Sequence, residues 1–319
     1  SAAANLLAAL IDNHLSRGNA LKIDPARITW KRAIDMNDRS LRDITVCHGH
    51  AMCVEREGHF VITAASEVMA CLCLANDLPE LKKMLGEIVV AYDREGRPVQ
   101  AKQLKAQGAM AAILRHAINP NLVQSIEGTP ALVHGGPFAN IAHGANSILA
   151  TKMALKLADY VVTEAGFGSD LGLEKFMDIV ARKAGCEPSA VVVVATLKAL
   201  KHHGCSEQPA KKDLAALEKG FANLEKHLEN TWLFGLNTVV AINRFPFDAK
   251  EEIAWLQKKC ESLGVKAVPS EVFTKGGKGG LELARAVLTE CTKPNRAAPL
   301  YGLNLPLREK IEAVARKVY

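Results

Sequence analysis

Aromatic residues are scarce in this chain of 319 residues, at 5% of the composition, and no run of lysine or arginine is interleaved with them. Proteins that bind nucleic acids rely on such basic and aromatic surfaces, so the composition argues against nucleic-acid binding. Charge of one sign is not abundant either, because 40 Lys+Arg against 34 Asp+Glu leave a net charge of only +6. A small anionic ligand fits this mild excess, and solvated lysine faces explain it equally well.

Long apolar runs are also missing from the sequence. No stretch of about eighteen uncharged apolar residues occurs, so the sequence predicts no membrane-spanning helix. The apolar residues 2–11 have no basic segment before them and predict a helix rather than a secretory signal. We therefore expect no membrane partner and a cytoplasmic location.

The eight cysteines lack the spacings of metal-binding or redox motifs. Only one residue separates Cys71 from Cys73, whereas a C-x-x-C motif has two, and no paired C-x-x-C motif supports a zinc site. In a chain of this length we expect all eight to be reduced thiols. His48 and His50 have an H-x-H spacing that could hold a metal, but the surrounding glycines and charges favour a surface loop. We predict no metal site.

A regular alternation of short apolar runs and amphipathic segments is present after residue 121. Apolar runs predict strands at residues 131–133, 160–163, 190–195, 238–242 and 265–268. Helical periodicity predicts helices at residues 147–157, 171–183, 214–234, 250–263 and 280–291. The alternation indicates an α/β fold, a parallel sheet of the P-loop NTPase-like type with helices on both faces. We expect residues 121–319 to form this core and residues 1–120 a smaller helical and mixed α+β region.

Ligands of such sheets bind beyond the carboxyl ends of the strands, so the residues that follow each run are candidates for a site. The first run leads into HGGPFANIAHG, where Gly135 and Gly136 let the backbone approach an anion closely. A tight connection between strand and helix, without any ligand, explains these glycines equally well.

Polar and aromatic residues follow the later runs. The side-chain amide of Asn243 can donate and accept, as a reader of a nucleotide base must, although a turn residue has the same appearance. Phe245, Pro246 and Phe273 follow successive strands and can sandwich a flat heterocycle, or else close the end of the sheet as core. The loop KGGKGG at residues 275–280 has the composition of a phosphate loop, but no Walker A motif occurs in the chain.

Five motifs at these positions occur in the order VHGGPFANIAHGANS, VVTEAGFGSDLGLEKF, VVVVATLKALKHHG, VVAINRFPFD and GGKGGLELA. With upstream segments such as LKAQGAMAAILRHAINPNLVQSIEGTP, they resemble formate–tetrahydrofolate ligase (10-formyltetrahydrofolate synthetase) over essentially the whole chain. The resemblance implies an ATP-dependent ligase of one-carbon metabolism that makes 10-formyltetrahydrofolate through formyl phosphate. It implies formate, tetrahydrofolate and ATP as ligands, Mg²⁺ and a monovalent cation as cofactors, and a homo-oligomer.

The resemblance also implies roles for individual residues. In the family the pterin ring stacks between a Phe-Pro pair, here Phe245 and Pro246, and a tryptophan, whose position is Phe273 in this sequence. Phe138 matches an aromatic residue of the formyl-phosphate pocket. The candidate catalytic residues are Phe138, Asn140, His143 and Glu164. The candidate nucleotide contacts are Asn243, Gly135 and Gly136.

The family's phosphate loop for ATP, and the arginine that holds formyl phosphate, have no counterpart in this sequence. We therefore expect a central portion of such an enzyme, with little ligase turnover by itself. The alternative is a non-catalytic relative that binds folate or nucleotide, or that assembles with active subunits. A GTPase-like switch protein would need a Walker A motif with a D-x-x-G in register, and the sequence lacks this combination.

Overall fold

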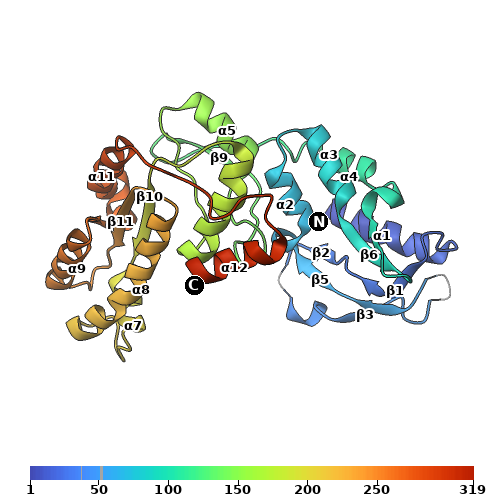
Figure 1. Ribbon diagram of the computed structural model, residues 1–319, viewed down its shortest axis with the longest axis horizontal. Helices are drawn as coiled ribbons and strands as arrows, with labels where there is room; N and C mark the ends of the chain where they lie inside the picture. Colours follow the sequence, from blue (N-terminus) through green and yellow to red (C-terminus); the bar gives the residue numbers. More distant parts are fainter. Residues whose placement is uncertain (37, 51–52) are drawn as a thin grey trace. The chain divides into compact units, whose positions relative to one another are not determined.

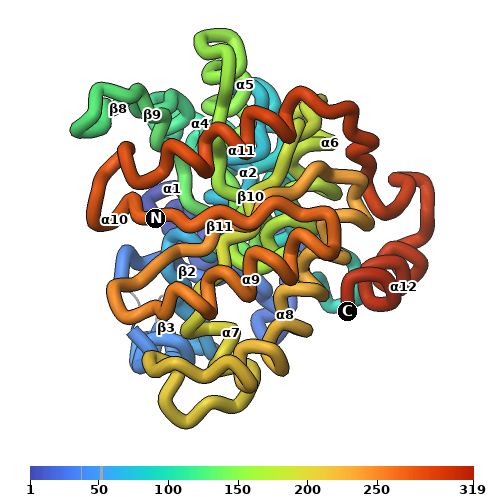
Figure 2. Tube along the Cα trace, turned by 90° about the vertical axis from the view of Figure 1, so that its left-hand side faces the viewer, coloured from blue at the N-terminus to red at the C-terminus, as the bar shows by residue number. Residues whose placement is uncertain are grey.

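The computed structural model describes residues 1–36, 38–50 and 53–319. The chain divides into two compact units, Ser1–Gly166 and Phe167–Tyr319 (Figure 1, Figure 2). Each combines helices with small sheets, so the α/β class predicted from the sequence is confirmed at this level. None of the described helices has the length and apolarity needed to cross a bilayer. The predicted boundary after residue 120, between a mixed α+β region and a parallel-sheet core, stays a prediction.

The first unit contains a three-stranded antiparallel sheet in the order β1-β6-β7 and three two-stranded ladders. Its strands are β1 (Ile23–Ile28), β2 (Arg32–Ile34), β3 (Ile44–Val46), β4 (Arg56–Gly58), β5 (Phe60–Ile62), β6 (Val89–Asp93), β7 (Pro98–Gln100), β8 (Asn121–Gln124) and β9 (Pro130–Val133). Its helices are α1 (Ala2–Ser16), α2 (Glu67–Leu74), α3 (Leu78–Glu87), α4 (Gln107–Leu114) and α5 (Ile148–Leu157), with 3-10 turns at Arg39–Leu41, Thr63–Ala65 and Ala101–Leu104.

The core of the first unit lies between the β1-β6-β7 sheet and the helices α1, α3 and α4 (Figure 1). Leu7 of α1, Leu85 of α3 and Met110 of α4 have no exposed surface and belong to one apolar cluster with Val90 of β6. The spacing of apolar residues along these helices creates the buried stripe, because residues three or four apart share a helix face. Asp77 begins α3 by accepting a hydrogen bond of 2.7 Å from the backbone of Glu80.

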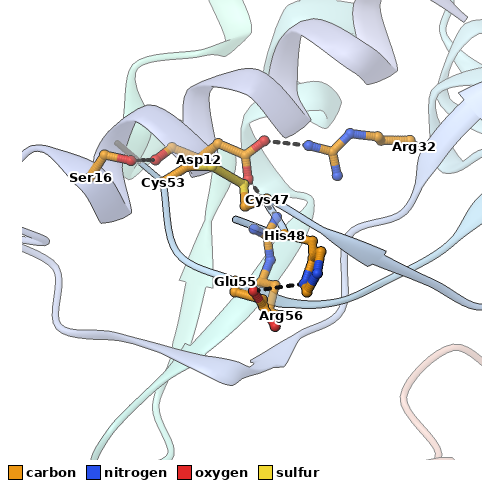
Figure 3. The surroundings of a disulfide bond; sticks show 8 residues. All are labelled: Asp12, Ser16, Arg32, Cys47, His48, Cys53, Glu55 and Arg56. Carbon is orange, nitrogen blue, oxygen red and sulfur yellow. Dashed lines mark hydrogen bonds and ion pairs between the residues drawn. A yellow bond between two sulfur atoms is a disulfide. The ribbon is translucent and has the colours of Figure 1, made fainter. Parts of the chain in front are cut away.

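A disulfide joins Cys47 to Cys53, so the prediction of eight reduced thiols is wrong for this pair (Figure 3). The strands β3 and β4 pair antiparallel with Val46 opposite Arg56, and this ladder brings the two cysteines to a Cα separation of 5.7 Å. That separation lies within the range a disulfide spans. The sequence did not reveal the pair, because the hairpin ladder rather than a cysteine motif creates it.

The second unit is built on a parallel sheet in the order β10-β11-β12. Its strands are β10 (Val191–Ala195), β11 (Thr238–Asn243) and β12 (Lys266–Ser270). Its helices are α6 (Arg182–Ala184), α7 (Leu197–His203), α8 (Leu214–Leu233), α9 (Lys250–Ser262), α10 (Val272–Lys275), α11 (Leu281–Cys291) and α12 (Leu307–Lys317), with π-helical turns at Gly168–Leu173 and Phe176–Ala181 and a 3-10 turn at Gly276–Gly280.

Helices cover both faces of the central strand β11. On one face Val240 and Ile242 belong to an apolar cluster with Phe221 of α8 and Leu256 of α9. The helix α11 contacts β11 and β12 but adds no residue to that cluster, and Figure 2 shows α9 and α11 on opposite sides of β11. A strand buried on both faces has a continuous apolar sequence, which is why the run at residues 238–242 was recognisable.

Two of the five predicted strands do not join this parallel sheet, so their predicted place in it is wrong. Residues 131–133 do form a strand, but β9 pairs antiparallel with β8 and is largely exposed. Residues 160–163 have no regular structure. Short apolar runs of three or four residues carry no information on their pairing partner. The alternation of apolar and amphipathic segments therefore predicted too many strands for the parallel sheet. Within the described residues the parallel sheet has three strands.

The interior of the second unit holds a charged pair. Lys201 of α7 has no exposed surface, and its ammonium donates to Glu252 Oε2 at 3.1 Å and to the carbonyl of Lys211 at 2.7 Å. The other carboxylate oxygen of Glu252 accepts from the backbone of Asp213 at 2.7 Å. Lys201 lies on the buried face of α7, whose other face is exposed. The pair links α7, the start of α8, and α9.

Candidate functional site

The glycine turn of the first unit packs against helix α2. Gly135 has a φ of +69°, and a Cβ at this position would lie 2.1 Å from Cys73 Sγ. Only glycine fits both the backbone conformation and the space. Burial raises the pKa of the Cys73 thiol to about 11, and a hydrogen bond with the backbone of Gly136 partly opposes that rise. The thiol therefore stays neutral at physiological pH and supports the turn.

His134 holds the other side of this turn. Its Nε2 lies 2.7 Å from the carbonyl of Ala117, which can only accept, so Nε2 carries the proton and donates. Its Nδ1 then accepts from Ser147 Oγ at 2.6 Å. The same Ser147 hydroxyl begins helix α5 by accepting from the backbone of Ala150 at 3.0 Å. His134 is buried, and sequence reasoning noted it only as part of the turn, although it links the turn to α5.

The four catalytic candidates of the first unit differ in their exposure to solvent. Phe138 and Asn140 are exposed on the turn that follows the glycines, and the backbone of Ala142 donates to the carbonyl of Phe138 at 2.7 Å. His143 is only 2% exposed and is buried inside the unit. Glu164 is exposed in the irregular segment near the end of the unit.

The folate candidates belong to the second unit, at the carboxyl edge of its sheet. Asn243, the last residue of β11, is paired in register with Ser270, the last residue of β12. The backbone of Arg244 donates to the carbonyl of Ser270 at 3.1 Å. The two loops that carry Phe245 and Phe273 therefore leave the sheet side by side, as the predicted order of strands β11 and β12 requires.

The ligand candidates on these loops differ in their exposure to solvent. Phe273 in α10 is 93% exposed, and Pro246 is exposed beside a half-buried Phe245. The alternative prediction, that these side chains close the end of the sheet as core, is wrong for Phe273 and Pro246. An exposed ring gains free energy when a flat ligand covers it, which is the behaviour of a binding surface.

Phe247 also belongs to this aromatic edge, and the sequence reasoning missed it. Its ring stacks on Phe245 with centroids 5.3 Å apart and an interplanar angle of 6°. The signal was available as a second aromatic residue two positions after the first in NRFPFD. Phe247 therefore packs against one face of Phe245.

A buried carboxylate fixes the start of the Phe245 loop. Asp248 Oδ2 accepts from the backbone of Phe245 at 2.8 Å, while its Oδ1 is buried without a hydrogen-bond partner. Burial raises the pKa of Asp248, and the hydrogen bond from Phe245 and the charge of Lys201 oppose that rise. Asn243, the nucleotide candidate, lies half-buried at the same end of β11. The Phe245 loop is therefore held by its own short turn.

In the ranges that the structure describes, no three His, Cys, Asp or Glu side chains are grouped as they are around a metal ion. Nδ1 of His48, one member of the H-x-H pair, instead lies at hydrogen-bond distance, 3.1 Å, from Oε2 of Glu55 (Figure 3).

The candidate residues thus form two groups, one in each unit: a glycine turn with Phe138 in the first, and an aromatic edge with Phe245 and Phe273 in the second. Both groups lie in motifs of one family. The sequence model of the family described as formate–tetrahydrofolate ligase matches residues 1–319, which is the whole chain. This chain belongs to the formate–tetrahydrofolate ligase family.

Proposed function

We propose that this chain binds tetrahydrofolate at the aromatic edge of its second unit and serves the ATP-dependent formylation of that folate in one-carbon metabolism. The observation that carries the proposal is the pair of adjacent loops, fixed by the register of β11 and β12, that present the half-buried Phe245 and the exposed Pro246 and Phe273. A pterin is flat and aromatic, so it can stack on Phe245 and Phe273 as other heterocycles stack on aromatic rings.

The reaction that the family implies has two steps. A formate oxygen attacks the γ-phosphorus of ATP, ADP leaves, and formyl phosphate forms. N10 of tetrahydrofolate then attacks the formyl carbon, inorganic phosphate leaves with the electron pair of the broken C–O bond, and the proton of N10 passes to that phosphate. Positioning and charge neutralisation dominate phosphoryl transfer, so backbone N–H groups and exposed side chains near the phosphate are the relevant protein groups.

In the first unit, we propose that the turn at Gly135 and Gly136 approaches the phosphate and that Phe138 lines the formyl-phosphate site. Asn140 and Glu164 are exposed and remain catalytic candidates, whereas His143 is proposed to support the turn. In the second unit, we propose that Asn243 contacts the nucleotide base.

We propose that Mg²⁺ reaches the protein bound to ATP, since Mg²⁺ is commonly held by substrate phosphates with only one or two carboxylates. The monovalent cation, the homo-oligomer, the cytoplasmic location and the P-loop NTPase-like type of the parallel sheet stay predictions.

Hydrogen exchange tests the folate site directly. Saturating tetrahydrofolate is expected to slow amide exchange in the loops at residues 243–248 and 271–280, because a ligand stacked on Phe245 and Phe273 restricts their opening. p-Aminobenzoylglutamate, which lacks the pterin, is the matched control and is expected to protect neither loop. Exchange that is unchanged at saturating tetrahydrofolate would contradict the proposed site.

Replacing Phe273 by tryptophan is expected to tighten tetrahydrofolate binding. The larger ring offers more stacking area, a gain of up to about 1 kcal/mol or roughly fivefold in Kd. Isothermal titration of wild type, Phe273→Trp and Phe273→Leu measures the effect, and the leucine variant is expected to bind more weakly than wild type. Equal affinity of all three proteins would show that the ring at position 273 does not touch the ligand.

A further inference from the structure

We propose that Glu271 is a positioning residue that fastens the two aromatic loops of the second unit to each other, so that Phe245 and Phe273 receive the ligand as one surface. The inference rests on the proposed folate site and adds a residue to which the family resemblance assigned no role. Glu271 is the first residue after β12, and its side chain forms hydrogen bonds with both loops.

The carboxylate of Glu271 makes one ion pair to each loop. Its Oε1 accepts from Nη1 of Arg244 at 2.9 Å, and Arg244 immediately precedes Phe245. Its Oε2 accepts from Nζ of Lys275 at 2.6 Å, and Lys275 lies two residues after Phe273. Both oxygens are therefore used, one on each side. The hydrogen bond from Lys275, followed by the charges of Lys275 and Arg244, lowers the pKa of Glu271, so the carboxylate is ionised at neutral pH.

The backbone of Glu271 closes the loop that carries Phe273. Its N–H donates to the carbonyl of Gly279 at 3.1 Å, and its carbonyl accepts from the backbone N–H groups of Thr274 at 3.1 Å and Lys275 at 3.0 Å. The backbone of Gly279 passes so close that a Cβ there would lie 2.4 Å from the carbonyl oxygen of Glu271. The backbone thus shapes the loop, and the side chain connects the shaped loop to its neighbour.

The ion pairs of Glu271 are expected to affect ligand affinity much more than the free energy of unfolding. All three side chains are partly exposed, and ion pairs of that kind contribute little to the free energy of unfolding. Two loops that already share one orientation lose less conformational entropy when a ligand bridges them, so preorganisation strengthens binding. Loss of the Glu271 carboxylate should therefore weaken ligand binding while the fold remains.

The first test uses the ligand-free protein and does not depend on folate. In Glu271→Gln, amide exchange is expected to accelerate in both loops, at residues 244–248 and 272–280. In Lys275→Met it is expected to accelerate mainly in the second loop, because the Arg244 contact remains. Glu282→Gln, an exposed carboxylate in the following helix, is the matched control. Acceleration confined to residues 272–280 in Glu271→Gln would overturn the inference.

The second test measures the Kd of tetrahydrofolate by titration. Glu271→Gln is expected to raise the Kd about five- to tenfold, with the midpoint of urea unfolding unchanged. Added KCl is expected to raise the wild-type Kd and to change that of Glu271→Gln less, since salt screens partly exposed ion pairs. A wild-type protein that does not bind tetrahydrofolate contradicts the proposed function. A wild-type protein that binds it with the same affinity as Glu271→Gln contradicts only the role of Glu271.

Discussion

Replacing Lys201 by methionine is expected to lower the free energy of unfolding of the second unit by about 3–5 kcal/mol. Glu252 would then remain buried with a negative charge and without its cationic partner, since Lys201 Nζ is the ammonium 3.1 Å from its carboxylate. Removing one member of a fully buried ion pair costs more than the pair itself contributes, because the remaining charge has already lost its hydration.

Urea unfolding followed by tryptophan fluorescence measures this loss. Trp30 replaced by phenylalanine leaves Trp232 and Trp255, both in the second unit, as the reporters. Lys198→Met, an exposed lysine on the same helix, is the matched control and is expected to change stability by less than about 1 kcal/mol. A similar small change in Lys201→Met would show that the pair is not buried in solution.

The double variant Lys201→Met with Glu252→Gln distinguishes two causes of the lost stability, the unpaired charge of Glu252 and the lost packing of Lys201. A glutamine at position 252 keeps a carbonyl oxygen for the backbone N–H of Asp213 but carries no charge. We expect this double variant to recover more than half of the lost stability, because two neutral side chains avoid the desolvation penalty of an unpaired ion. No recovery would mean that packing, not charge, accounts for the loss.

The second large effect is expected at Glu174, which lies in the interior next to Asp178. Burial, the negative charge of Asp178 and a hydrogen bond between the two carboxyl groups together raise the pKa of Glu174 from 4.5 to about 7. The folded protein therefore binds more protons than the unfolded chain between these two pH values. Stability falls as the pH rises through this window and stays reduced above it, by up to about 3 kcal/mol.

Glu174→Gln is expected to be more stable than wild type at pH 8 and to differ little at pH 5. The amide has the shape of the protonated carboxyl group and can still donate to Asp178, but it never acquires the charge. Urea unfolding at the two pH values measures the difference. Burial also raises the pKa of Asp178, so a smaller fall of stability with pH is expected to remain in the variant.

Glu282→Gln, which removes an exposed carboxylate, serves as the control and should follow the wild-type pH dependence. Equal pH dependence of wild type and Glu174→Gln would contradict the buried, protonated state of Glu174. Glu174 lies between the two π-helical turns Gly168–Leu173 and Phe176–Ala181, so its burial was not predictable from the sequence. A helix with irregular hydrogen bonding turns side chains away from the faces that the 3.6-residue period predicts.

Long periodic segments were predictable because a local cause suffices for them. The helix α8 was predicted at residues 214–234 and forms at Leu214–Leu233, since its apolar stripe and the cap from Asp213 are both local. The strand β11 was predicted from a continuous apolar run, which two covered faces require. The neighbouring positions of Phe245 and Phe273 followed from the order of β11 and β12 alone.

The features that the sequence did not reveal depend on contacts between distant residues. A lysine in a polar stretch gives no sign that an acidic side chain from another helix will neutralise it, as Glu252 does for Lys201. The disulfide of Cys47 depends on a hairpin register, and the pairing of β9 depends on β8 rather than on its own apolar run. Sequence motifs thus identified the family of this protein, and local periods indicated its α/β class. Only the tertiary structure decided which charges are buried, which strands pair, and that one carboxylate connects the two aromatic loops, because each of these requires partners that approach only when the chain has folded.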